Sequence, residues 1–294
     1  MDLDQLITEA GSDDTRDLHL RGTAELVELM NRLDAAVPGV VAGAAGEVAA
    51  VVDGVVERLR AGGRLIYVGA GSSGRQALAD AAECEATFST APGQVVALFA
   101  GEDEAAEDDS EAGARAVAEL GIGARDAVIG VSAGGRTPYV LAALEAAARE
   151  GAFTACVVSA PGSPLGELVE REIAVVVGPE LVAGSTRLRA GTAQKLVLNQ
   201  ISTVSMVRLG KVYDNLMVDV AAGNEKLRAR ARRIVETVTG ASAVEAREAL
   251  AAADGSAKVA IVSMLAGVSA GEARARLAAS GGDIRTALDG SEPA

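Results

Sequence analysis

The sequence predicts an α/β fold in which helices cover both faces of a five-stranded, largely parallel sheet. Short apolar runs with the length and flanking glycines of buried strands recur at Arg64–Gly69, Val95–Ala100, Ala127–Val131, Phe153–Ser159 and Ile173–Val177. Segments compatible with helices separate them, at Arg75–Cys84, Ser110–Leu120, Tyr139–Glu150 and Ser163–Val169. Strands and helices that alternate at this spacing are typical of a doubly wound parallel sheet.

Helical segments precede and follow the predicted sheet. An Ala- and Val-rich stretch at Val40–Leu59 predicts a helix before it, and Ala190–Leu209 predicts a long helix after it. In the last 55 residues, Ser242 with Glu245 and Ser269 with Glu272 match the capping box, and a third short helix fits between them. The chain therefore divides, by prediction, into an N-terminal helical segment (1–62), a sheet domain (63–225) and a C-terminal helical domain (226–294).

Composition excludes several classes of function. The 294 residues include 41 acidic and 27 basic side chains, and the net charge of −14 disfavours nucleic acid or an anionic membrane as a partner. No apolar run reaches the roughly 18 residues that span a bilayer, and the N-terminus lacks the basic residues of a signal peptide. The chain has a single histidine, His19, which makes a Ser-His-Asp triad or a His-ligand metal centre improbable. Its two cysteines, Cys84 and Cys156, are far apart and do not have the spacing of zinc ligands. We therefore expect a cytoplasmic protein without a metal ion or cofactor.

Two glycine-rich loops follow predicted strands and open helices. They are Gly69–Arg75 and Ser132–Pro138. Small residues, hydroxyls and backbone N–H groups at the positive end of a helix suit a phosphate group. The glycine spacing of the first loop matches neither a Walker A loop nor G-x-G-x-x-G, so nucleotide binding has little support. The alternative interpretation is that both loops are tight strand-to-helix turns.

Carboxylates near the same sheet edge are candidates for acid–base chemistry. Glu83 ends the helix that begins at the first loop, and an acidic run at Glu102–Asp109 follows the second strand. Two carboxylates that converge on one sugar-sized cleft suffice for general acid–base catalysis. For the acidic run, a solvated loop or the first turn of a helix is the alternative interpretation.

Four motifs closely resemble those of N-acetylmuramic acid 6-phosphate etherases. They are Gly69–Arg75, Asp80–Cys84, Gly135–Val140 and the long run Val176–Val220, which includes Gly184–Arg187 and Ala190–Asn199. The resemblance extends from about Leu6 to Leu288. It implies a three-layer α/β/α fold of the sugar isomerase (SIS) type, a small C-terminal helical bundle and a homodimer that acts on a small sugar phosphate.

The resemblance also implies a reaction and roles for individual residues. Family members remove D-lactate from N-acetylmuramic acid 6-phosphate and leave N-acetylglucosamine 6-phosphate. By motif position, Glu83 corresponds to the catalytic acid and Glu107 to the base. The substrate-binding positions fall on the two loops, at Ser72, Ser73, Gly135, Arg136 and Thr137.

This sequence departs from the family pattern at several positions. Gly134 stands where the second loop usually has serine, and Asp214 stands where we expect glycine. The segment before Glu107 is shorter than usual. These departures keep open a second hypothesis, a non-catalytic sugar-phosphate sensor of the SIS type. A third, an aldose–ketose sugar-phosphate isomerase, has no support in Val176–Val220.

Overall fold

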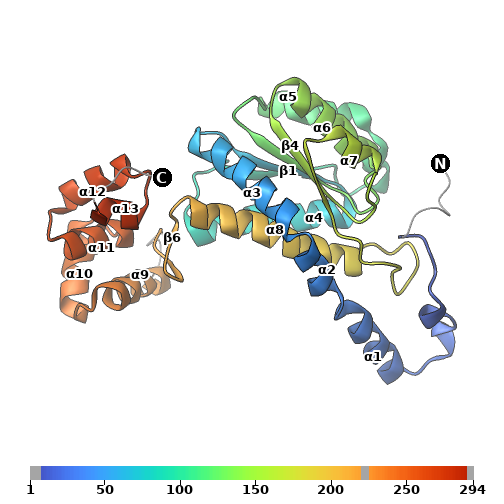
Figure 1. The fold of residues 1–294 in the computed structure, drawn as a ribbon, viewed down its shortest axis with the longest axis horizontal. Helices are drawn as coiled ribbons and strands as arrows, with labels where there is room; N and C mark the ends of the chain where they lie inside the picture. The colour runs from blue at the N-terminus through green and yellow to red at the C-terminus, as the bar shows by residue number, and fades with distance from the viewer. Residues whose placement is uncertain (1–7, 220–224, 290–294) are drawn as a thin grey trace. The chain divides into compact units, whose positions relative to one another are not determined.

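The computed structural model describes residues 8–219 and 225–289, and the chain forms two compact units (Figure 1). One unit comprises Met1–Ala82 and Gly93–Ser202, and the other comprises Glu83–Pro92 and Thr203–Ala294. Helices α4 (Gly71–Phe88) and α8 (Arg189–Arg208) each contribute residues to both units. The three-part division with limits at 62 and 225 stays a prediction. Val220, the last residue of the long family motif, lies outside the described residues.

A five-stranded parallel sheet forms the centre of the first unit, as the sequence predicts. Its strands lie in the order β2-β1-β3-β4-β5. They are β1 (Leu65–Gly69), β2 (Val95–Phe99), β3 (Ala127–Val131), β4 (Phe153–Val158) and β5 (Arg171–Ala174). The chain moves outward in one direction from β1 to β2 and in the other from β3 onward. Because crevices for ligands form where the strand order reverses, the carboxyl ends of β1 and β3 are where a site is expected.

Helices cover both faces of this sheet (Figure 1). On one face lie α5 (Ser110–Leu120), α6 (Pro138–Arg149) and α7 (Pro164–Leu168), and on the other lies α3 (Ala45–Arg60). Alternate strand residues such as Ile66, Val68 and Val128 pack against Val140 and Leu144 of α6. Tyr67 faces the opposite way, and its hydroxyl donates to Asp80 of α4 at 3.1 Å. The result is the predicted three-layer α/β/α arrangement.

The N-terminal helices differ from the prediction. The expected helix Val40–Leu59 is two helices, α2 (Val37–Gly43) and α3, which meet at Ala44. Pro38 lies in the first turn of α2, where its missing N–H removes no hydrogen bond. Before them lie α1 (Thr23–Asp34) and two short 3₁₀ helices, η2 (Asp13–Thr15) and η3 (Leu18–Leu20).

Strand β5 begins and ends earlier than expected. The sequence places it at Ile173–Val177, but the ladder with β4 runs over Arg171–Ala174. Arg171 is exposed because β5 is an edge strand, where charged residues are tolerated and discourage pairing with other chains. Val175 and Val177 are buried beyond the end of the strand, which explains why an apolar run alone misplaces it.

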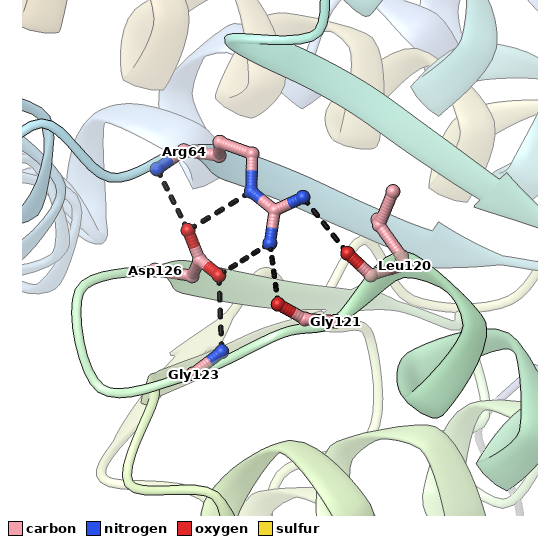
Figure 2. A network of polar contacts seen from close by, with 5 residues as sticks. All are labelled: Arg64, Leu120, Gly121, Gly123 and Asp126. Carbon is pink, nitrogen blue, oxygen red and sulfur yellow. Dashed lines mark hydrogen bonds and ion pairs between the residues drawn. The ribbon is translucent and has the colours of Figure 1, made fainter.

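A partly buried ion pair joins the starts of β1 and β3, at the end of the strands opposite the glycine loops (Figure 2). Arg64 donates from its backbone N–H and from Nε to Oδ1 of Asp126, at 2.9 and 3.1 Å, and from Nη2 to Oδ2 at 2.7 Å. The same guanidinium donates to the carbonyls of Leu120 and Gly121, each at 3.0 Å. The network fixes the loop after α5 against both strands.

Five helices and a hairpin make up most of the second unit. The helices are α9 (Glu225–Thr239), α10 (Ala243–Ala252), α11 (Ala257–Ala266), α12 (Ala270–Ala279) and α13 (Ile284–Asp289). Strands β6 (Val212–Tyr213) and β7 (Leu216–Met217) form the hairpin, and Asp214 in its turn has a φ of 53°. This left-handed conformation explains the family's glycine there, and Asp is among the residues that tolerate it.

Only one of the two predicted capping boxes is complete. Ser242 accepts the N–H of Glu245, whose carboxylate accepts the N–H of Ser242 in return. Ser269 likewise caps α12 by accepting the N–H of Glu272. The carboxylate of Glu272 instead binds Arg276 one turn later, at 2.5 Å, so the second half of the expected box is wrong.

Candidate active site

A polar cavity of about 490 Å³ lies at the carboxyl edge of the sheet in the first unit. Residues that follow β1, β2 and β3 line it, together with two from a later loop. The main lining side chains and glycines are Gly71, Ser72, Ser73, Arg75, Glu102, Asp103, Glu107, Ser132, Gly134, Thr137, Gly184 and Thr186. The cavity therefore lies at the switch point of the strand order.

The first wall of the cavity is the start of α4. Gly71 has a φ of +49°, a conformation that favours glycine, and it turns the chain sharply from β1 into the helix. A Cβ at Gly71 would lie 2.6 Å from Oε1 of Glu107, so that carboxylate packs directly against the glycine. Glu107 comes from the short 3₁₀ helix η4 (Glu104–Asp108) after β2. The positive end of α4 favours a negative charge at this position.

Two serines of the same loop face the cavity, and one is held from a distant helix. Ser73 Oγ donates to Oε1 of Gln194 on α8 at 3.0 Å. Gln194 is buried, with 1% of its surface exposed. The N–H groups of the first helical turn have no intrahelical acceptors, so together with these hydroxyls they suit an anion.

The second wall is the loop between β3 and α6. Ser132 is buried, accepts the N–H of Gly135 at 3.1 Å, and lies 3.0 Å from the hydroxyl of Thr137. The hydroxyl of Ser132 is therefore used to hold the loop. Gly135 has a φ of +62°, and a Cβ there would lie 2.1 Å from Ser163 Oγ, so this glycine is required for the loop to pack against α7. Around Gly134, by contrast, a Cβ would meet no atom within 4 Å.

Charged side chains at the cavity are mostly acidic. Among the described residues that line it, Arg75 is the only cation, against the carboxylates of Glu102, Asp103 and Glu107. The side chain of Arg75 pairs with Glu102 at 2.5 Å, and this hydrogen bond raises the pKa of Arg75, with Glu107 adding to the effect. An anionic group bound here must rely mainly on backbone N–H groups and hydroxyls.

Four predicted site residues lie together, and three do not line the cavity. Ser72, Ser73, Thr137 and Glu107 are all lining residues. Gly135 is buried within the second loop, and Arg136 of the same loop is exposed; neither lines the cavity. Their roles in substrate binding stay predictions.

Glu83 is the third residue that the cavity does not include. It is exposed on α4, which begins at Gly71. A rise of about 1.5 Å per residue puts Glu83 about 18 Å along the helix axis from Gly71. That length is several times the width of a sugar ring.

Sequence reasoning missed several residues of the site. Gly184 and Thr186 line the cavity, and Gln194 holds Ser73, but none of the three is charged and none forms a catalytic pattern that a search would select. The signal that could have found them is their place in the long family motif. Within residues 8–219 and 225–289, no three His, Cys, Asp or Glu side chains gather as metal ligands, and no single helix is long and apolar enough to cross a membrane.

Comparison with known proteins decides the family. The family model for the glucokinase regulatory protein N-terminal SIS domain matches residues 47–148. An N-acetylmuramic acid 6-phosphate etherase of Rubrobacter xylanophilus is 57% identical over 269 residues, which is 89% of each chain. An etherase of Mycolicibacterium smegmatis is 48% identical and covers 98% of this chain and 99% of its own. This chain belongs to the N-acetylmuramic acid 6-phosphate etherase family.

Solved structures show that the etherase shares its fold with sugar-phosphate isomerases. A phosphoheptose isomerase from Francisella tularensis has a TM-score of 0.50 at 18% identity, covering 62% of the etherase and 98% of its own chain. A putative phosphosugar isomerase from Bacteroides fragilis has a TM-score of 0.50 at 20% identity, covering 64% and 91%. The likeness confirms the SIS-type α/β fold that the sequence predicts.

Proposed function

We propose that this etherase cleaves the D-lactyl ether of N-acetylmuramic acid 6-phosphate to give N-acetylglucosamine 6-phosphate and D-lactate. Eight relatives that carry the etherase name are 44–57% identical to it over 82–98% of the chain, which supports a carbon–oxygen lyase. The observation that carries the site assignment is the cavity in which Glu107 meets the hydroxyls of Ser72, Ser73 and Thr137. Cys84 and Cys156 form no disulfide, which fits a cytoplasmic enzyme that recovers peptidoglycan amino sugars.

Glu107 is our candidate for the base. In the open-chain sugar, the C1 aldehyde acidifies the proton on C2, and the Glu107 carboxylate removes it. The electron pair left on C2 delocalises into the carbonyl as an enolate. Its return forms a C2–C3 double bond and expels the lactyl oxygen from C3, while a carboxylic acid, Glu83, protonates that oxygen. Water then adds at C3, and C2 takes up a proton.

The phosphate group is our candidate ligand for the start of α4. A dianion there accepts hydrogen bonds from the first-turn N–H groups and from Ser72, Ser73 and Thr137. The acidic side chains Glu102 and Asp103 disfavour a second anionic group nearby, so the sugar has one preferred direction in the cavity. Arg136, exposed in the second loop, contributes a positive charge next to the cavity-lining Thr137 in the sequence.

We propose that Glu83 reaches the reacting sugar from a second copy of the chain in a homodimer. A helical separation of about 18 Å between Gly71 and Glu83 keeps Glu83 out of the cavity lining of its own copy, where Glu107 lies. A homodimer with twofold symmetry presents each surface patch to its equivalent, so two such sites form together. This arrangement makes the dimer a requirement for activity.

The direct test is incubation of purified protein with N-acetylmuramic acid 6-phosphate while released D-lactate is measured. We expect release from the wild type and none from Glu83→Gln or Glu107→Gln. A wild type that binds the sugar phosphate but releases no lactate would sink the etherase proposal. It would favour the sugar-phosphate sensor, for which the missing hydroxyl at Gly134 is the supporting observation.

Mixing the two inactive variants tests the shared site. If each site takes Glu107 from one copy and Glu83 from the other, a mixed dimer has one intact site, and random exchange of subunits restores about a quarter of wild-type activity. If both glutamates come from one copy, the mixture stays inactive. The control is each variant mixed with itself under the same exchange conditions.

A further inference from the structure

The side-chain amide of Gln194 is buried, and only one of its two polar atoms has a hydrogen-bond partner among the described residues. Its Oε1 accepts the hydroxyl of Ser73 at 3.0 Å, across 121 residues of sequence. Its Nε2 is buried and has no hydrogen-bond partner among the described residues. Buried side-chain donors are nearly always satisfied in folded proteins, and an exception next to a binding site calls for a functional explanation.

A side-chain amide can rotate by half a turn without changing its shape. In the structure, the Ser73 hydroxyl donates its single proton to the amide oxygen of Gln194. It can therefore only accept a hydrogen bond from a group bound in the cavity. After rotation, Nε2 of Gln194 donates to Ser73 Oγ, and the hydroxyl proton is released toward the cavity. The rotated state leaves an amide oxygen in place of an amide N–H without a partner, and unsatisfied carbonyls are the more common exception in proteins.

A phosphate dianion can only accept a hydrogen bond from Ser73. It therefore favours the rotated state, and a charge-assisted hydrogen bond is stronger than the neutral one it replaces. We propose that Gln194 is a positioning residue that rotates its amide when substrate binds and so makes Ser73 a donor to the phosphate. This inference rests on the proposed function in one respect, the phosphate as the group bound at Ser73.

The role predicts a change in KM without a change in kcat. The phosphate is remote from the reacting C2 and C3 atoms, so its contacts are the same in the ground state and the transition state, and their loss raises KM alone. Gln194→Met keeps the volume but can neither accept from nor donate to Ser73, so it no longer orients the hydroxyl toward the phosphate, and we expect KM for N-acetylmuramic acid 6-phosphate to rise about tenfold with kcat within about twofold. The wild type must first release D-lactate in the same assay.

Gln194→Glu should raise KM in a pH-dependent way, because its carboxyl group can donate to Ser73 only when it is protonated. An ionised carboxylate at this position accepts the Ser73 proton and cannot return one, whereas a protonated carboxyl can donate. We expect the KM of this variant to approach that of the wild type as the pH falls through the carboxyl pKa, while the KM of Gln194→Met stays raised by a constant factor. A residue needed only for packing would show no such difference between the two variants.

A double-mutant cycle with Ser73→Ala tests whether Gln194 acts through Ser73. We expect Gln194→Met to raise KM no further when Ser73 is already alanine. Ser205→Ala is the matched control, because Ser205 is also buried on α8 and its hydroxyl has no hydrogen-bond partner within residues 8–219 and 225–289, but it does not line the cavity. The KM of Ser205→Ala should equal that of the wild type.

Two kinetic results would overturn the proposal. One is an unchanged KM in both Gln194 variants, and the other is full additivity of Gln194→Met and Ser73→Ala. If the wild type releases no lactate, the same cycle is measured by calorimetry with inorganic phosphate. Weaker phosphate binding in Gln194→Met, absent from the Ser73→Ala background, then supports the Gln194 role even though the etherase proposal has failed. Equal phosphate affinity in all variants overturns the Gln194 role separately.

Discussion

The Glu107 carboxylate occupies the space that a side chain on Gly71 would need. Oε1 lies 2.6 Å from the position of a Cβ on that glycine, so even a methyl group must displace the carboxylate. Because Gly71 also has a positive φ, it combines a backbone requirement with a direct contact to the proposed base. The contact links the turn after β1 to the residue that we assign to proton removal.

Gly71→Ala should therefore reduce catalysis far more than it reduces stability. A displacement of about 1 Å at a reacting group costs about a hundredfold in rate, and we expect at least this loss in kcat. The left-handed backbone adds about 1–2 kcal/mol of destabilisation. The measurements are D-lactate release and urea unfolding.

Gly121→Ala is the matched control for Gly71→Ala. Gly121 has a φ of +61° at the end of α5, but a Cβ there would meet no atom within 4 Å. We expect a similar loss of stability with normal kcat. If both variants keep wild-type kcat, the packing of Glu107 against Gly71 has no catalytic importance.

Gly134→Ser should strengthen substrate binding. The site has room for the side chain, since no atom lies within 4 Å of a Cβ, and the hydroxyl restores the serine that the family usually has. A hydrogen bond to a charged group contributes about 1.5–3 kcal/mol, so we expect KM to fall about tenfold or more. Gly134→Ala isolates the effect of the methylene group and should leave KM unchanged. Equal KM values for the serine and alanine variants would show that position 134 does not contact the phosphate.

Asp126→Asn should destabilise the first unit at neutral pH. Burial by itself raises the pKa of Asp126, but the hydrogen bonds from Arg64 and from the Gly123 N–H outweigh it and hold this pKa below its ordinary value. Loss of one partner from such a pair leaves Arg64 poorly compensated, and we expect about 2–3 kcal/mol less unfolding free energy, because Arg64 is partly exposed. Urea unfolding at pH 7 measures the difference.

The pH dependence of this difference has a defined sign. The folded pKa of Asp126 lies below the unfolded value, so its contribution is complete above about pH 4 and is lost as the pH falls through the folded pKa. The difference in unfolding free energy between the wild type and Asp126→Asn should become smaller over that pH range. Asp13→Asn is the control, because the Asp13–Arg16 pair is largely exposed and should change nothing measurable. If the difference in unfolding free energy between the wild type and Asp126→Asn stays constant down to pH 3, this account of Asp126 is wrong.

Cys156 should be inert in the folded protein. Burial on β4, with Glu172 nearby, raises the pKa of its thiol to about 12, so almost none is thiolate at pH 8. We expect no alkylation of Cys156 by iodoacetamide over an hour at pH 8, measured by mass spectrometry, and rapid alkylation in urea. Cys156→Ala should keep wild-type kcat. Alkylation of the native thiol within minutes would show that β4 opens far more readily than its burial implies.

The sequence predicted the layers of the fold well because hydrophobic periodicity reflects burial directly. Runs such as Leu65–Gly69 are buried on both faces, as expected for a strand in the middle of a parallel sheet covered on both sides. The same signal misplaced β5, because Val175 and Val177 are buried outside the ladder while charged Arg171 lies within it. The break at Ala44 was also missed, although Gly43 ends α2 and Gly46 lies in the first turn of α3, because Ala and Val on either side continue the apolar pattern.

The loop residues of the site could be predicted from the sequence, but the residue that holds Ser73 in place could not. Ser72, Ser73, Thr137 and Glu107 follow strands whose carboxyl ends meet at one edge, so topology alone brings them together. Gln194 comes from a helix more than a hundred residues later, and only the folded chain reveals its bond to Ser73. The distance of Glu83 from Gly71 follows from helix geometry, and the helix predicted from the first loop to Glu83 already implied it; the structure confirms that α4 is continuous over Gly71–Phe88.

Exchange of the C2 hydrogen in deuterated water tests the central claim most directly, because it separates the base from the acid. Wild-type enzyme should place deuterium at C2 of the N-acetylglucosamine 6-phosphate product while it releases D-lactate. We predict that Glu83→Gln, which keeps the base, still exchanges C2 of the substrate but releases almost no lactate. Glu107→Gln should do neither, although it still binds the substrate. Exchange at C2 by Glu107→Gln at the wild-type rate would contradict the assignment of Glu107 as the base.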